Sequence, residues 1–329
     1  MPTPTYTRGG NTAIAFVTET DYNDGVTTGD ATSWVSPISE SLQQIAEVTT
    51  INDLGHDASG LAGRAFSPSE YVQGDVVLAG SFDYYGILKR SAWGSVATTG
   101  AGPYTHTYTL VLDNPASMGA VMVRENTAGT KSEIECGGLQ VPTAVYAVDA
   151  RGFLQETYSL FGNIDTTWAS ATQTPAPPAP AIADVPLGKH VGTLAWNSGT
   201  FSLKSATFTV ARQVSPDQFV FGSTALGQSF AAQNLDVMIE FTLVPTDYSW
   251  ETARSAVTQS DAVLAFTSGT QSITFSLEDA YISSLTRNKS FGVDEITVQM
   301  KAASGGTFGA KMVVINDQSS AIVTQGTAA

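Results

Sequence analysis

A mainly β fold is predicted, arranged as two tandem units that each form an antiparallel sandwich or barrel sheet with one short helix packed against it. Three observations predict it. Strand-type alternation of Thr, Val, Ser, Phe and Tyr recurs along the 329 residues. Gly, Asn-Pro and Asp-Gly pairs separate these segments as turn residues do. A strand followed by a helix also occurs twice, once in each half of the chain.

The predicted strands alternate between apolar and polar positions, as strands with one buried face do. Residues 105–112 form one of them, and 143–148 and 155–161 are predicted to form a hairpin around the turn at 149–152. In the second half, the clearest strands are 201–211 and 272–277.

A proline-rich segment divides the chain into halves of comparable length. Five prolines lie between Thr172 and Pro186, among alanine and polar residues, a composition typical of a semi-rigid extended connector. We therefore expect a first unit at 1–171, a linker at 172–188 and a second unit at 189–329.

The two halves contain a matching strand and helix. Residues 75–82 align with 236–243, and both segments begin Asp-Val. Residues 83–92 align with 247–256, with five of ten positions identical. Asp83 and Asp247 open the predicted helices, where an N-cap carboxylate would accept the first free backbone N–H groups. This order of elements predicts a duplicated unit of strand, capped helix and strand.

The repeated strands have two different faces. Val237, Ile239, Phe241 and Leu243 form an apolar face in the second copy, and the first copy has a similar face. Acidic, small and hydroxyl residues lie opposite, including the acidic residues Asp75, Asp236 and Glu240. This second face is consistent with an ordinary solvated sheet surface. It is also consistent with a wet wall that discourages polyanions from binding.

Composition and motifs exclude several function classes. Thirty acidic residues against 15 basic ones give a net charge of −15, which disfavours tight binding of nucleic acid. One cysteine excludes an intrachain disulfide and a cysteine-rich metal site. Because phosphate-loop, nucleophile-elbow and zinc-protease motifs do not occur, we expect no enzyme, cofactor or metal. The chain shows no secretory signal or membrane-spanning segment, so synthesis in the cytoplasm is expected.

Several segments together carry a family resemblance. The chain resembles the tail tube proteins, or major tail proteins, of long-tailed bacteriophages. The resemblance rests on the order of these segments and covers about residues 30–305: 74–82 with the helix after it, 103–108, 120–125, 135–138, the hairpin ending at 161–162, and 219–222.

This resemblance implies a virion structural protein made of two tail-tube-like domains. Such proteins form stacked rings with an inner β-barrel, through which double-stranded DNA passes during ejection. A duplicated chain would close as a homotrimer with pseudo-sixfold symmetry, carrying 3 × −15 = −45 formal charges. The tape measure and tail terminator proteins are the other partners expected from the family, and no membrane is involved. Asp75, Asp236 and Glu240 would then line the lumen and repel DNA phosphates.

Two other classes remain open at this point. One is a different self-assembling β-protein, such as a capsid decoration, surface-layer or fimbrial subunit. The other is a carbohydrate-binding module, in which exposed tryptophans would stack on sugars. Its candidates are Trp34, Trp93, Trp168, Trp196 and Trp250.

Overall fold

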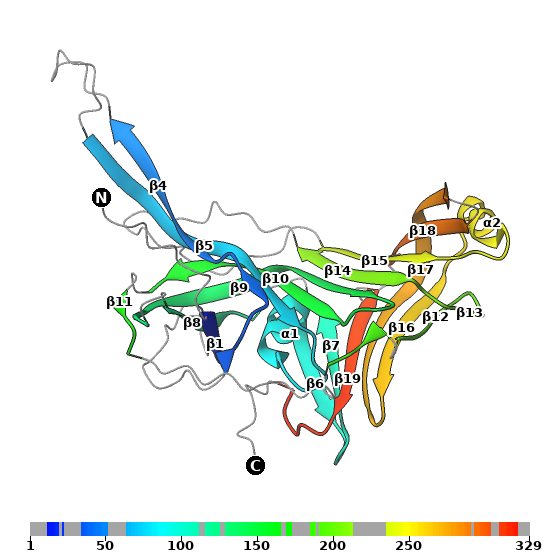
Figure 1. The fold of residues 1–329 in the computed structure, drawn as a ribbon, viewed down its shortest axis with the longest axis horizontal. Coiled ribbons are helices and arrows are strands. Elements are labelled where there is room, and N and C mark those ends of the chain that lie inside the picture. Colours follow the sequence, from blue (N-terminus) through cyan, green and yellow to red (C-terminus); the bar gives the residue numbers. More distant parts are fainter. Residues whose placement is uncertain are drawn as a thin grey trace.

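The computed structural model describes most of the chain, and antiparallel strands dominate it (Figure 1). The prediction of a mainly β fold with short helices is thereby confirmed. The described residues are 12–19, 22, 34–51, 64–111, 116–125, 129–165, 169–172, 185–188, 191–212, 235–290, 293–303 and 309–321.

The larger sheet, sheet A, contains strands from both halves of the chain. Its main run follows the order β4 (Gln43–Ile51), β5 (Arg64–Ala79), β10 (Gln155–Ile164), β9 (Lys131–Asp149), β14 (Ser205–Arg212), β15 (Leu235–Leu243), β18 (Val293–Lys301) and the second part of β17 (Gln271–Ser290). Shorter or flanking strands complete it: β3 (Ser39–Glu40) beside β5, β11 (Ala169–Ser170) and β8 (Met118–Glu125) beside β9, then β1 (Thr12–Thr18) and β2 (Trp34–Val35).

The smaller sheet, sheet B, also mixes the two halves. Its order is β6 (Gly94–Thr99), β7 (Tyr104–Leu110), β19 (Ala310–Asn316), the first part of β17, β16 (Ser260–Ser268), β12 (Val191–Trp196) and β13 (Gly199–Phe201). Strand β17 belongs to both sheets. It leaves sheet B near Asp279, which has a positive φ of 48°, and pairs with β18 from Tyr281 onward.

The main core lies between the two sheets, and a second, smaller cluster of described residues is formed by Ala13, Ala15, Trp34, Val121 and Val123. Phe275 of sheet B stacks on Phe208 of sheet A with ring centroids 4.8 Å apart, and lies 4.9 Å from the ring of Tyr146, also of sheet A. Every second residue of the central strands is buried in the main core, as the alternation predicted. The architecture is therefore a sandwich with a continuous apolar interior.

The two halves are joined by direct strand pairing, which the sequence did not predict. In sheet A, β14 pairs with the C-terminal part of β9, and in sheet B, β19 pairs with β7. Most of the expected linker at 172–188 lies outside the described residues. Its end is held by Leu154 N–H, which donates to Pro186 O (2.7 Å), and by Gly188 N–H, which donates to Gly152 O (2.9 Å). The duplication, and the boundaries at 171 and 189, stay predictions.

Helix α1 (Gly86–Trp93) begins later than expected, so the assignment of Asp83 as its N-cap is wrong. The N-cap residue is Tyr85, with φ 67°. Ser81 fixes the turn before the helix instead, because its Oγ accepts the backbone N–H groups of Asp83 (3.1 Å) and Tyr84 (3.2 Å). The Asp83 carboxylate accepts a hydrogen bond from Gln271 Nε2 (3.1 Å), on sheet B.

Helix α2 (Ser249–Ser255) has Tyr248 as its N-cap, so the assignment of Asp247 is wrong by one residue. The Asp247 carboxylate nevertheless accepts the backbone N–H of Ser249, the first residue of the helix (2.9 Å). Hydrogen bonds from the Ser249 side chain and backbone lower the pKa of Asp247. An acidic side chain next to the free N–H groups of a helix is favourable even without the N-cap geometry.

Candidate functional site

The open face of sheet A brings two of the predicted acidic residues into one row. Through four consecutive strand pairings, Asp75 faces Ser159, Ser159 faces Thr143, Thr143 faces Ala211, and Ala211 faces Asp236. Directly paired residues of antiparallel strands point to the same side of a sheet. The two carboxylates lie on β5 and β15, which are separated by four inter-strand spacings. At about 4.8 Å for each spacing, these two strands are about 19 Å apart.

The side of sheet A opposite this row is the sandwich core. The next row in the same register is Val76, Tyr158, Ala144, Val210 and Val237, all buried. The sheet therefore has the two different faces that the repeated strands predicted, and both halves of the chain contribute to each face. On the open face, hydroxyl and small side chains predominate: Thr143, Ala147, Thr157, Ser159, Ser205, Thr207, Thr209, Ala211, Thr242 and Thr297.

Glu240 lies on the same open face, four residues along β15 from Asp236. It faces Thr207 on β14 and Gln299 on β18. Glu240 is exposed and has no hydrogen-bond or ion-pair partner among the described residues. The structure thus places all three predicted acidic residues on one face of sheet A, the face away from the core.

The other two acidic residues have partners. Asp75 is exposed and accepts a hydrogen bond from Ser159 Oγ (2.6 Å). Asp236 forms an ion pair with Lys301 Nζ (2.7 Å), and both side chains keep about a third or more of their surface exposed. A half-exposed ion pair contributes at most about 1 kcal/mol to stability, so this pair has little role in the fold. It does offset the negative charge locally.

Sequence reasoning missed two charged residues of this face. Asp149 continues the outward positions of β9 after Val145 and Ala147, and it pairs with Ser205. The alternation of β9 is the signal that identifies Asp149, although the sequence predicts that this residue begins the turn at 149–152. Lys301 could not be identified in this way, because its place beside Asp236 depends on the pairing of β15 with β18.

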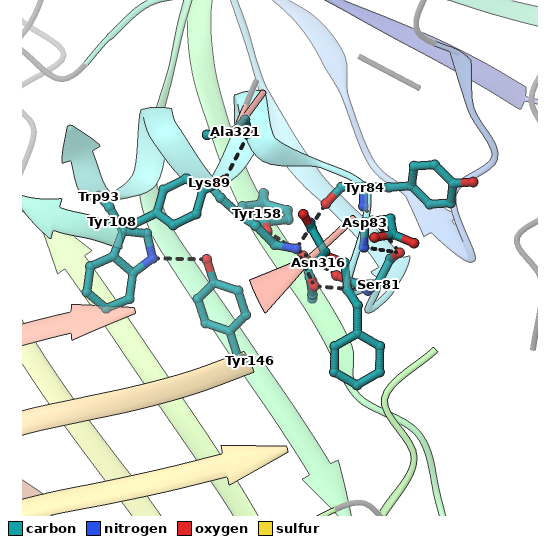
Figure 2. A network of polar contacts seen from close by, with 12 residues as sticks. Ser81, Asp83, Tyr84, Lys89, Trp93, Tyr108, Tyr146, Tyr158, Asn316 and Ala321 are labelled. Atoms are coloured by element: carbon teal, nitrogen blue, oxygen red, sulfur yellow. Dashed lines mark hydrogen bonds and ion pairs between the residues drawn. The ribbon is translucent and has the colours of Figure 1, made fainter. Parts of the chain in front are cut away.

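A second polar cluster is fully buried under helix α1 (Figure 2). Lys89, 1% exposed, donates from Nζ to the carbonyl oxygens of Ser81 and Tyr84, both at 2.9 Å, and lies 3.3 Å from Glu156 Oε1. The other carboxylate oxygen of Glu156 accepts the Tyr158 hydroxyl at 2.5 Å. Each charge therefore has an ion partner and further hydrogen bonds.

Tyrosines surround this ion pair, and the pKa of each is raised. Burial, followed by the negative charge of Glu156, raises the pKa of Tyr85, Tyr108, Tyr146 and Tyr158 well above the ordinary tyrosine value. Their hydroxyls serve as structural contacts: Trp93 Nε1 donates to Tyr146 (3.2 Å), and Tyr108 donates to Ala321 O (3.0 Å). The cluster joins α1, sheet A and the last described residues of the chain, which is the role of a structural network.

The predicted sugar-stacking tryptophans are mostly in the core. Trp34, Trp93, Trp196 and Trp250 are each no more than 4% exposed. Trp196 and Trp250 stack on each other at 5.1 Å between ring centroids. A ring that is covered by protein on both faces has no face free for a sugar. Trp168 lies outside the described residues.

Within the described part of the chain, no group of three or more His, Cys, Asp or Glu side chains is placed to hold a metal ion. Cys136 is buried, and burial raises the pKa of its thiol to about 12. None of the helices in the described residues is long and apolar enough to span a membrane.

No protein-family model matches the chain, and a search of curated proteins finds no significant match.

Proposed function

We propose that this protein is a structural subunit of a bacteriophage tail tube, located in the virion. The observation that carries the proposal is the open face of sheet A. There, strands from both halves present hydroxyl, small and acidic side chains, including Asp75, Asp236 and Glu240, with the core directly behind them. A surface of small, hydroxyl and acidic side chains suits a channel for double-stranded DNA, because it offers the DNA phosphates few cations to bind.

The edges of sheet A support self-assembly. The second part of β17 pairs with β18 on one side, and no described strand pairs with its other edge. At the opposite end of the sheet, β4 pairs with β5 and likewise has no described partner on its outer side. Open edges are sites of pairing with another chain. Copies that continue the sheet from one to the next would place their open faces around a common lumen.

The charges support passage of DNA without specific binding. A net charge of −15 per subunit gives a ring a strongly negative field. Screening at physiological salt limits repulsion to about 8 Å, so carboxylates on the wall itself dominate. By the resemblance, the tape measure and tail terminator proteins would be the other tail partners.

Negative-stain imaging of the purified protein tests this proposal. We expect stacked rings or hollow tubes with a central channel. Flat lattices or solid fibres would instead favour a surface-layer or fimbrial subunit, and a monomer at all concentrations would contradict self-assembly.

Reversing the wall charges tests the conduit. We expect the triple variant Asp75→Lys, Asp236→Lys, Glu240→Lys to form tubes of normal length but to hinder DNA delivery, because cations on the wall attract phosphates. The measurement is the DNA ejected from assembled particles. As a matched control, Asp261, Glu278 and Asp317, which lie on or beside strands of sheet B, are changed to lysine in a second triple variant. Equal delivery by both variants and the unchanged protein would contradict the lumen assignment.

A further inference from the structure

Exposed apolar side chains gather at one end of the molecule. The described residues contain four exposed large hydrophobic side chains. Three of them flank helix α2: Val244 (51% exposed), Tyr248 (64%) and Val257 (61%). We call these three residues the α2 surface. Grouped exposed apolar residues mark interaction sites more often than isolated ones do.

Helix α1, the corresponding helix of the first half, is buried by other parts of the chain, and helix α2 is not. Seven of the eight residues of α1 are buried, whereas Trp250 is the one buried residue of α2. Helix α1 is covered by other parts of the same chain, and the carbonyl oxygen of Ala321 lies so close to Gly86 that a Cβ there would be 1.8 Å away. Helix α2 packs against β17 at the edge of the structure, away from α1 (Figure 1). Its outer side is available to another molecule.

Val257 keeps its apolar side chain at a backbone position that favours glycine. The end of α2 is a Schellman motif, in which Val257 N–H donates to Arg254 O (3.1 Å) and Thr258 N–H donates to Ala253 O (3.0 Å). The residue at this place adopts left-handed geometry, and Val257 has φ 49°. A β-branched residue is strained there. A strained backbone position that carries an exposed valine in place of glycine indicates that the valine side chain has a role other than in folding.

Tyr248 is held in place for contact. The Arg287 guanidinium lies over its ring, 4.5 Å from the centroid, and Arg287 Nε donates to Glu251 (2.7 Å). The ring is therefore oriented although it is 64% exposed. Oriented tyrosines are frequent anchors of protein interfaces, because little side-chain entropy is lost on binding.

The fourth exposed apolar residue lies at the other end of sheet A. Ile38 (52% exposed) precedes β3, and its N–H donates to Val77 O on β5 (2.8 Å). The two ends also carry the free edges of sheet A. Helix α2 packs on β17, whose second part has no described partner on its outer side, and Ile38 lies beside β3 and β5, next to the free edge of β4. Continuation of the sheet from one copy to the next would bring these unlike ends together.

We propose that the α2 surface of one copy binds the Ile38 end of a second copy of this chain. The contact is head-to-tail, so it leaves the same two surfaces free on the outer copies and can close into a ring. The proposal of this α2–Ile38 contact rests on the self-association in the proposed function. It does not depend on whether the assembly conducts DNA.

Cross-linking tests which surfaces meet. Cysteines are introduced as Ile38→Cys and Val257→Cys in separate preparations, which are mixed and treated with a bismaleimide. The native Cys136 is buried and does not compete. We expect a cross-linked dimer in the mixture and not in either preparation alone, and a ladder that ends at the ring size when one chain carries both cysteines. Ile38→Cys mixed with Ala101→Cys, in the exposed turn between β6 and β7, is the control and should stay uncross-linked.

Val257→Gly separates folding from association. Glycine suits the left-handed position, so we expect a melting temperature equal to or above that of the unchanged protein. Association should weaken at least about tenfold in the concentration at which half of the chains assemble, as for loss of an interface anchor. Val257→Asn should behave in the same way, and Val257→Ile should assemble normally.

The outcomes distinguish the two proposals. Normal tubes from Val257→Gly, with no Ile38–Val257 cross-link, would overturn the α2–Ile38 contact and leave the tail tube function standing. Cross-linked oligomers that never form tubes would support the contact and contradict the function. An unchanged protein that stays monomeric and uncross-linked would overturn both.

Discussion

Replacing Lys89 with methionine is expected to destabilise the fold by about 3–5 kcal/mol, a large part of the stability of an ordinary domain. The substitution fills the same volume but leaves the Glu156 carboxylate, 0% exposed, without its cation. It also removes the donor to the carbonyl oxygens of Ser81 and Tyr84, which shape the turn into α1 (Figure 2). Urea unfolding followed by circular dichroism measures the loss.

Arg90→Met is the matched control, because Arg90 is the next residue of α1 and is not buried. It should change stability by less than about 1 kcal/mol. The double variant Lys89→Met, Glu156→Gln should be more stable than Lys89→Met alone, since it removes the uncompensated charge. A loss of less than 1 kcal/mol for Lys89→Met would show that the ion pair is not buried as described.

The sequence predicted those features of the fold that depend on local pattern. Alternation identified β7, the hairpin of β9 and β10, and the two faces of β5 and β15. From those faces, Asp75, Asp236 and Glu240 were placed on one side of their strands, and the structure places them there. Period-2 alternation determines which residues share a face, whatever the strand pairs with.

The sequence could not predict which strands pair across the halves. Nothing local distinguishes a β9–β14 pair from two separate sheets, because sheet pairing depends on contacts between residues far apart in the chain. For the same reason nothing in the sequence indicates that Lys89 pairs with Glu156, which is 67 positions later in the chain. The Asp83 assignment failed because Ser81, two residues earlier, takes the turn's N–H groups.

Alkaline pH is expected to unfold the protein steeply above about pH 10. Tyr85, Tyr108, Tyr146 and Tyr158 all have a raised pKa in the fold, first because of burial and then because of Glu156. Their stabilising contribution is complete below the unfolded tyrosine pKa of about 10 and decreases above it, because only the unfolded chain then releases the four protons. Each proton changes the free energy of unfolding by about 1.4 kcal/mol per pH unit, so the four together lower it by about 5 kcal/mol per unit.

The variant Tyr108→Phe isolates one of these protons. It loses the hydrogen bond to Ala321 O, which costs about 1 kcal/mol at neutral pH. Above pH 10, however, its free energy of unfolding should fall less steeply than that of the unchanged protein, by about 1.4 kcal/mol per pH unit. The two curves should therefore converge near pH 11, which a merely weakened fold would not show. Parallel curves, measured by urea unfolding from pH 8 to 11, would mean that the Tyr108 hydroxyl titrates in the folded protein as it does in the unfolded chain. Helix α1 and the C-terminal segment would then not enclose this residue against Glu156.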